Sequence, residues 1–237
     1  MHPGHRRRTG LTGHRRALGP AIVVALVTFG LSVGPAAASS SASAQAKKGL
    51  LKLSDMPAGW TAAKSSDDNG AIPGATQLAK CLGVPRKVII GTPPSATSEQ
   101  FTSKDDLEDA SDNVTIYKSV SAARADFNSF ATPKTPSCLT TVFNGPAKKQ
   151  LTGEFGSGAT VGAVQVSRSP ASAFGPGTAN AVIFFPVTMK GVTLNVELIL
   201  TDYVNGTSEQ SVQFIGIQSP VPTSLTKHLT SVADSRI

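Results

Sequence analysis

Few side chains in this sequence are placed to carry out catalysis. Three of the four histidines lie within the first 14 residues, so His228 is the sole imidazole in the rest of the chain. A serine hydrolase triad would need His228 as its base, and no G-x-S-x-G elbow is present. A zinc site would have to combine carboxylates with that single imidazole, which is unusual. We therefore expect no catalytic residue, no metal site and no bound cofactor.

Short motif matches do not change this expectation. Ser224 to Lys227 fits S-x-x-K, and Ser111-Asp112-Asn113 spells the second motif of penicillin-recognising enzymes. Those enzymes carry the two motifs in the opposite order and add a K-T-G element that this chain lacks. Gly156-Ser-Gly158 precedes a predicted strand instead of following one, which excludes a dinucleotide fingerprint.

Charge argues against nucleic acid as a partner. The net charge is +7, but residues 1–44 contain five arginines and no acid, which leaves 17 basic and 15 acidic residues. No basic stripe with interleaved aromatic residues follows. The acidic stretch Asp105–Asp109 has one interpretation as a cation site and another as a solvated loop. We favour the loop, because runs of acids usually mark solvated segments.

The first 44 residues resemble a targeting segment. After the arginines comes the apolar run Ala21–Val33, which is too short to span a bilayer, and then the small-residue sites Ala36–Ala38 and Ala42–Ala44. We predict that residues 1–44 are a cleaved signal peptide and flexible leader; the alternative is an uncleaved anchor. The mature protein is expected to be secreted, extracellular or cell-wall associated, with no membrane span after cleavage.

The remaining residues, 45–237, suit a single monomeric domain. Cys81 and Cys138 are the only cysteines. Because the chain is directed to an oxidising compartment, we predict a disulfide between them.

The segment Ala181–Gln218 predicts a three-stranded antiparallel meander. Placing Met189 opposite Val192 across a Lys190-Gly191 turn makes one face of the first hairpin wholly apolar and the other mixed. An Asn205-Gly206 turn predicts a third strand, with two registers open: Leu198 opposite Gln213, or opposite Val212 after a one-residue slip.

Proline adds a constraint to this meander. The strand around Pro186 must lie at an edge, or its pairing with the alternating segment 159–168 must break near Pro186, because proline donates no backbone hydrogen bond. Helices are predicted from Ser119 or Ser121 to Phe130, over 137–143 and from Thr223 or Ser224 onward. The predicted class is α+β: a curved antiparallel sheet with helices packed on one face and one disulfide.

One stretch resembles a known family. Leu51-Lys-Leu-Ser-Asp-Met-Pro-Ala-Gly-Trp60, together with the signal peptide, two cysteines and a meander closed by a helix, is similar to secreted actinobacterial sensor-like domains. The resemblance is to the extracellular domains of mycobacterial serine/threonine kinases. It implies a curved sheet with helices around a cleft for an unidentified ligand. Those domains tend to carry two disulfides, and they supply no catalytic residues.

Three functions remain open on these grounds. The first is a non-enzymatic sensor-like domain of the cell envelope or extracellular space that binds an unknown small molecule or envelope component. Its site would lie on the mixed face of the sheet, with Thr193, Asn195 and Glu197 as ligand-binding residues beside the loop 169–178. The second is a small envelope hydrolase that uses paired carboxylates. The third is a structural role in envelope assembly.

Overall fold

The fold is an antiparallel sheet with helices on both sides. The computed structural model describes residues 40–65, 74–91, 93–169, 174 and 177–237, so the predicted signal peptide lies outside the described residues up to position 39. The strand order is β1-β3-β4-β9-β8-β7-β5, with β2 also paired to β4 and β6 to β7. The strands are β1 (Thr61–Ala63), β2 (Ser95–Thr97), β3 (Gln100–Thr102), β4 (Glu108–Ile116), β5 (Thr160–Val161), β6 (Gln165–Ser167), β7 (Ala179–Met189), β8 (Val192–Asn205) and β9 (Ser208–Ile217).

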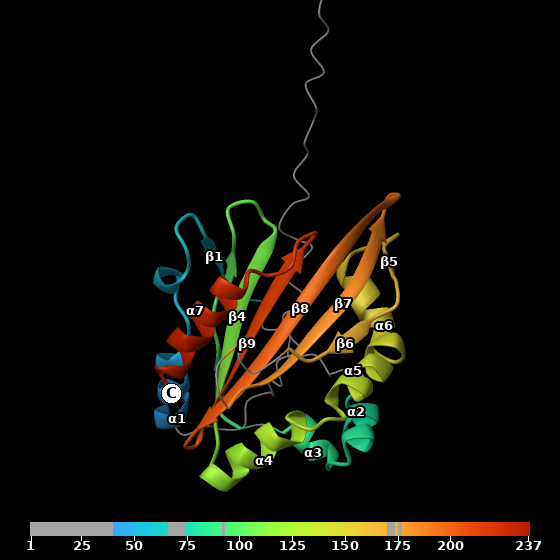
Figure 1. The fold of residues 1–237 in the computed structure, drawn as a ribbon. Helices are drawn as coiled ribbons and strands as arrows, with labels where there is room; N and C mark the ends of the chain where they lie inside the picture. Colours follow the sequence, from blue (N-terminus) through green and yellow to red (C-terminus); the bar gives the residue numbers. More distant parts are fainter. Residues whose placement is uncertain (1–39, 66–73, 92, 170–173, 175–176) are drawn as a thin grey trace, which may run out of the picture.

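The helices pack against both faces of this sheet. They are α1 (Ser40–Gly49), the 3₁₀ turn η3 (Leu53–Asp55), α2 (Ala75–Leu82), α3 (Arg86–Ile89), α4 (Val120–Phe130), α5 (Thr135–Asn144), α6 (Lys148–Glu154) and α7 (Thr223–Asp234). Figure 1 shows α7 crossing the sheet beside β4 and β9. Helices α4, α5 and α6 follow one another along the bottom and lower right of the view, apart from α7. The α+β class with an antiparallel sheet is confirmed. The prediction that helices cover one face is corrected, because α5 and α6 pack on one face of the sheet and α7 packs on the other.

Two hydrophobic clusters define these faces. On the α5 face, Ile183, Phe185 and Leu198 pack with Val142 and Phe143 of α5. On the α7 face, a second cluster joins the sheet to α7; its members include Val182, Ile199, Phe214, Leu225 and Leu229. Side chains alternate between the two faces along each strand, so both faces need a cover.

The first hairpin of the meander has the predicted register. Met189 pairs with Val192, and the ladder runs without a slip to Ala179 opposite Asp202. Lys190 and Gly191 both have positive φ, at 49° and 78°. A two-residue turn with positive φ at both positions is the type I′ geometry that matches the twist of the strands.

The second hairpin differs from both predicted registers. Asn205 pairs with Ser208, and Leu198 pairs with Ile215, so the turn consists of Gly206-Thr207 and not of Asn205-Gly206. Gly206 has a φ of 58°, which suits a turn with glycine at its first central position. Moving the turn by one residue shifts the register by two, so every side chain keeps its face.

The interruption at Pro186 is confirmed. β5 ends its pairing with β7 at Val161 opposite Val187, and β6 resumes at Gln165 opposite Phe184. Between them the Gly162 amide donates to the Pro186 carbonyl at 2.8 Å. A Cβ on Gly162 would lie 2.5 Å from the Pro186 Cγ, so the chain passes the proline ring only because residue 162 has no side chain.

The predicted disulfide is present. Cys81 of α2 and Cys138 of α5 are bonded, with their Cα atoms 5.6 Å apart. Cys138 is buried in a small cluster with Ala79, Leu82 and Ile89. The bond therefore fixes α2 and α3 against α5.

The stretch that carries the family resemblance is held by the C-terminus. Arg236 binds the Asp55 carboxylate through both Nη atoms, at 2.7 and 2.8 Å, and also donates to the Leu50 carbonyl. Burial alone would raise the pKa of Asp55, but the hydrogen bonds from Arg236 and the Lys52 amide lower it overall. The adjacent Leu51 amide donates to Asp112. Hydrogen bonds therefore link this N-terminal stretch to Arg236 near the C-terminus and to Asp112 of β4.

The helix α1 begins inside the segment that was predicted to be a flexible leader. It starts at Ser40, and its Ala46 is fully buried against Val114 and Ile116 of β4. Residues 40–44 are helical because small apolar side chains of α1, such as Ala42 and Ala46, pack on β4. The division into residues 1–44 and 45–237 stays a prediction. Among the described residues, no helix is long and apolar enough to cross a membrane.

We predict that Gly162→Ala destabilises the fold, by roughly 1 to 3 kcal/mol, because the new Cβ overlaps the Pro186 ring. Urea unfolding of the purified protein measures this free energy. Gly153→Ala in α6 is the matched control, since nothing lies within 4 Å of its Cβ position. Equal stability of the two variants would show that the passage at Pro186 is not tight.

Candidate functional site

The α5 face changes from apolar to polar along β8 and β9. Leu198, Leu200 and Asp202 follow one another on this face, opposite Ile215, Gln213 and Ser211. Asp202 is buried, and the Ser211 hydroxyl donates to its carboxylate. Burial raises the pKa of Asp202 to about 7, against the effect of the Ser211 hydrogen bond. On the α5 face of β8, the carboxyl group of Asp202 therefore follows the apolar side chains of Leu198 and Leu200.

A second buried carboxyl lies nearby on β9. Glu209 is 6% exposed, and its Oε2 atom has no hydrogen-bond partner. Burial raises its pKa, and the neighbouring carboxyls of Asp202 and Asp126 raise it further. Two acids that share a low-dielectric site do not both ionise readily, so this cluster retains protons at neutral pH.

Helix α4 brings the third acid to this cluster. Ser119 caps the helix by accepting from the Ala122 amide, at 3.2 Å. Asp126, in the next turns, accepts a 2.7 Å hydrogen bond from the Tyr117 hydroxyl. Burial raises the pKa of Asp126 despite that bond, and burial with the nearby acids also raises the pKa of Tyr117. Asp126 and Tyr117 remain partly exposed.

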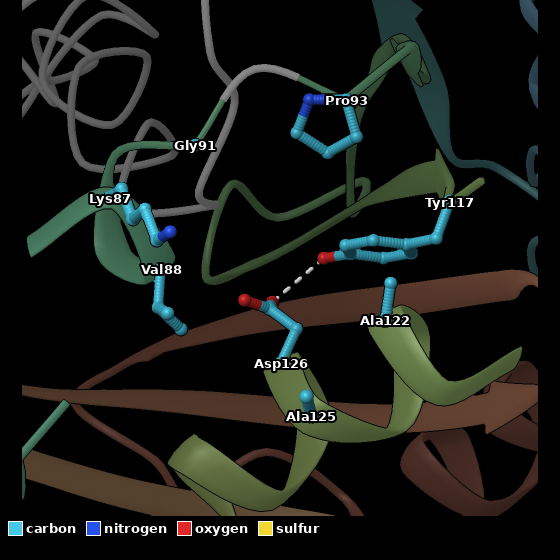
Figure 2. Close-up of a pocket in the computed structure, with 8 residues that line it drawn as sticks. All are labelled: Lys87, Val88, Gly91, Pro93, Tyr117, Ala122, Ala125 and Asp126. Atoms are coloured by element: carbon cyan, nitrogen blue, oxygen red, sulfur yellow. Dashed lines mark hydrogen bonds between the residues drawn. The ribbon is translucent and has the colours of Figure 1, made fainter. Parts of the chain in front are cut away.

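These partly exposed groups face a pocket between α3 and α4 (Figure 2). Its volume is about 280 Å³. The lining residues are Lys87, Val88, Gly91, Pro93, Tyr117, Ala122, Ala125 and Asp126. Figure 2 shows Tyr117 and Asp126 on one side and Lys87 of α3 on the other. An apolar wall with a few convergent polar groups is typical of a small-molecule site.

The arrangement bears on the hydrolase alternative. Hydrolysis by two carboxylates needs both of them beside the scissile bond. Here Asp126 lines the pocket, whereas Glu209 and Asp202 do not line it and are buried. Among the described residues no group of histidine, cysteine and acidic side chains is arranged to hold a metal ion.

The predicted ligand-binding residues lie on the α7 face, away from this pocket. Glu197 is buried and accepts the Val221 amide at 2.6 Å, so it holds the segment before α7. Thr193 and Asn195 are exposed, and Thr193 shares a 2.9 Å hydrogen bond with Thr188. The role of these three residues in ligand binding stays a prediction.

Two features of the sequence indicate the pocket and the carboxyl cluster behind it, and neither was recognised from the sequence. Asp126 comes three residues after Ala123 and four before Phe130, within the apolar stripe of its helix. Asp202 continues the row of Leu198 and Leu200. An acid inside an apolar pattern is a sign of a buried polar site.

Other singled-out residues have structural roles. Asp112, from the Ser111-Asp112-Asn113 match, is buried on the α7 face and accepts from Gln210 Nε2 at 2.6 Å. His228 is exposed, and its Nε2 lies 3.1 Å from the Asp55 carbonyl oxygen. In the acidic stretch, Asp105 and Asp106 lie in a turn, while Asp109 enters β4 and is buried.

Comparison with known proteins gives a likeness to solved structures, one of which is an extracellular domain. No protein-family model matches the chain, and no curated protein matches its sequence. The chain is similar to the extracellular domain of PknH from Mycobacterium tuberculosis, with 11% identity and a TM-score of 0.42. The match covers 82% of this chain and 96% of that domain. This domain is of the class that the sequence is predicted to resemble, and at this identity and TM-score the likeness assigns no residue a role.

We predict that Asp202→Asn changes how stability depends on pH. A folded-state pKa raised from 3.8 to about 7 means that the native protein keeps a proton that the unfolded chain releases, so wild-type stability falls between pH 4 and 7. The asparagine variant does not titrate, and its oxygen still accepts from Ser211. Its stability relative to wild type should rise over this interval by up to about 4 kcal/mol.

Urea unfolding at half-unit pH steps measures this difference. Asp234→Asn, at an exposed position of α7, is the matched control and should show no such change. A difference between Asp202→Asn and wild type that stays constant from pH 4 to 7 would contradict the raised pKa.

Proposed function

We propose that this protein is a secreted, non-enzymatic ligand-binding domain whose site is the pocket between α3 and α4. The observation that carries the proposal is the Tyr117–Asp126 pair, which presents polar atoms to a pocket of about 280 Å³. A partly buried polar pair usually serves either stability or binding. This pair opens on a pocket with apolar walls, which favours binding.

The pocket suits binding better than catalysis. The described residues that line it present one carboxyl, one phenol and one ammonium group, and they include no nucleophile paired with a base. The disulfide supports an extracellular or cell-wall location, because such bonds persist in oxidising compartments. The ligand is a small molecule or a part of an envelope component, since the pocket volume limits what enters it.

The uncovered end of the α7 face is our second candidate surface. Phe184 is 41% exposed there and lies opposite Glu197 in the register. Thr193 and Asn195 are exposed on the same face. A flat polar surface with one exposed ring suits a larger envelope component. The loop 169–178, predicted to lie beside this surface, falls largely outside the described residues.

We predict that protein recovered from its producing cells carries a small ligand, seen as a mass adduct in a native spectrum and absent after denaturation. Ala125→Leu, which fills the pocket, should abolish the adduct. Asn128→Leu is the matched control: it adds the same side chain at an exposed position of α4 that does not line the pocket. The control should keep the adduct.

Two results would overturn the placement of the site. An adduct that survives Ala125→Leu excludes the pocket. If that adduct is then lost in the Thr193→Ala/Asn195→Ala double variant, the ligand binds on the α7 face. A bare wild-type protein would favour the structural role in envelope assembly over ligand binding.

A further inference from the structure

Opposite charges face each other across the pocket without forming an ion pair. Figure 2 shows the Lys87 ammonium, carried by α3, and the Asp126 carboxyl, carried by α4, both directed into the same space. The ion pair found among the described residues joins Arg236 to Asp55. Lys87 and Asp126 are therefore separated by a gap that a ligand can occupy.

The surface between the two charges is apolar. Val88, Pro93 and Ala122 form walls around that gap. A ligand that fills it meets an anionic group at one end, a cationic group at the other and hydrocarbon between them. Charge-assisted hydrogen bonds at both ends would be stronger than neutral ones and would fix its orientation.

We infer that the pocket binds a small zwitterion, a molecule with an amine that meets Asp126, an anionic group that meets Lys87, and an apolar skeleton between them. This inference rests on the proposed function and gives it a ligand class. A purely anionic ligand would leave Asp126 facing it with like charge. A purely cationic ligand would place a like charge next to Lys87.

The groups behind Asp126 favour an ammonium at its end of the pocket. Tyr117 donates to Asp126, while Glu209 of β9 and Asp202 of β8 are further acids beside it. Among the described residues that line the pocket, Lys87 is the one basic residue. An added ammonium would stabilise the ionised form of Asp126, which burial disfavours. Because that contact needs Asp126 ionised and its pKa is raised, affinity should fall as the pH is lowered.

Three probes with similar carbon chains test the inference. They are 6-aminohexanoate as the zwitterion, n-pentylamine as the cation and hexanoate as the anion, each titrated into the purified full-length mature protein and followed by calorimetry. Hexan-1-ol is a fourth, uncharged probe. We expect 6-aminohexanoate to bind roughly tenfold or more tightly than either singly charged probe.

Two variants assign the ends of the ligand. Asp126→Asn keeps an acceptor for Tyr117 and should weaken the binding of 6-aminohexanoate roughly tenfold while leaving hexanoate no weaker. Lys87→Gln should weaken 6-aminohexanoate similarly and leave pentylamine no weaker. The matched controls are Asp234→Asn and Lys80→Gln, at exposed positions outside the pocket, and both should bind as wild type does.

The outcomes separate this inference from the proposed function. If pentylamine, hexanoate or hexan-1-ol binds as tightly as 6-aminohexanoate, or if Asp126→Asn leaves 6-aminohexanoate unaffected, the zwitterion inference is wrong and the pocket remains a binding site. If none of the four probes binds, both the inference and the pocket are overturned.

Discussion

The alternation of side chains along the β7–β8–β9 meander is the constraint on which the rest of the structure depends. Once Met189 pairs with Val192, every residue of β7 and β8 is assigned to one face of the sheet. One face then requires α5 and α6 as a cover, and the other requires α7. The same alternation places Asp202 and Ser211 on the α5 face. The polar site is therefore a consequence of the strand register.

Helix α4 covers the point where this face becomes polar. Removing a carboxylate from water costs several kcal/mol unless the group is neutralised or hydrogen-bonded. Asp202 has the Ser211 hydroxyl and Asp126 has the Tyr117 hydroxyl, whereas one oxygen of Glu209 has no partner. The cluster is thus stabilised mainly by holding protons. A site that tolerates this cost without an evident gain in stability is more easily explained by function than by folding.

Local patterns in the sequence were sufficient for much of the fold. The Lys190-Gly191 turn, the interruption at Pro186 and the bond between Cys81 and Cys138 each follow from the chemistry of one or two residues. The turn at Gly206 was misplaced by one residue, because Asn-Gly is favoured at a hairpin but cannot by itself exclude its neighbour.

The pocket could not be predicted in the same way. Lys87, Tyr117 and Asp126 come from three separate elements and meet only because the disulfide and the sheet bring those elements together. The prediction of helices on one face failed for a related reason. Whether a mixed strand face is covered depends on how distant segments pack, and Ile199 and Phe214 give the α7 face enough apolar surface to bind a helix.

The carboxyl cluster of Asp126, Glu209 and Asp202 holds protons at neutral pH. Carbon-13 NMR of these three side-chain carboxyls, followed from pH 3 to 10, measures this protonation directly. At least one of the three should still be protonated at pH 7, and Asp202 should titrate near that pH. Titration of all three near pH 4 would contradict this prediction.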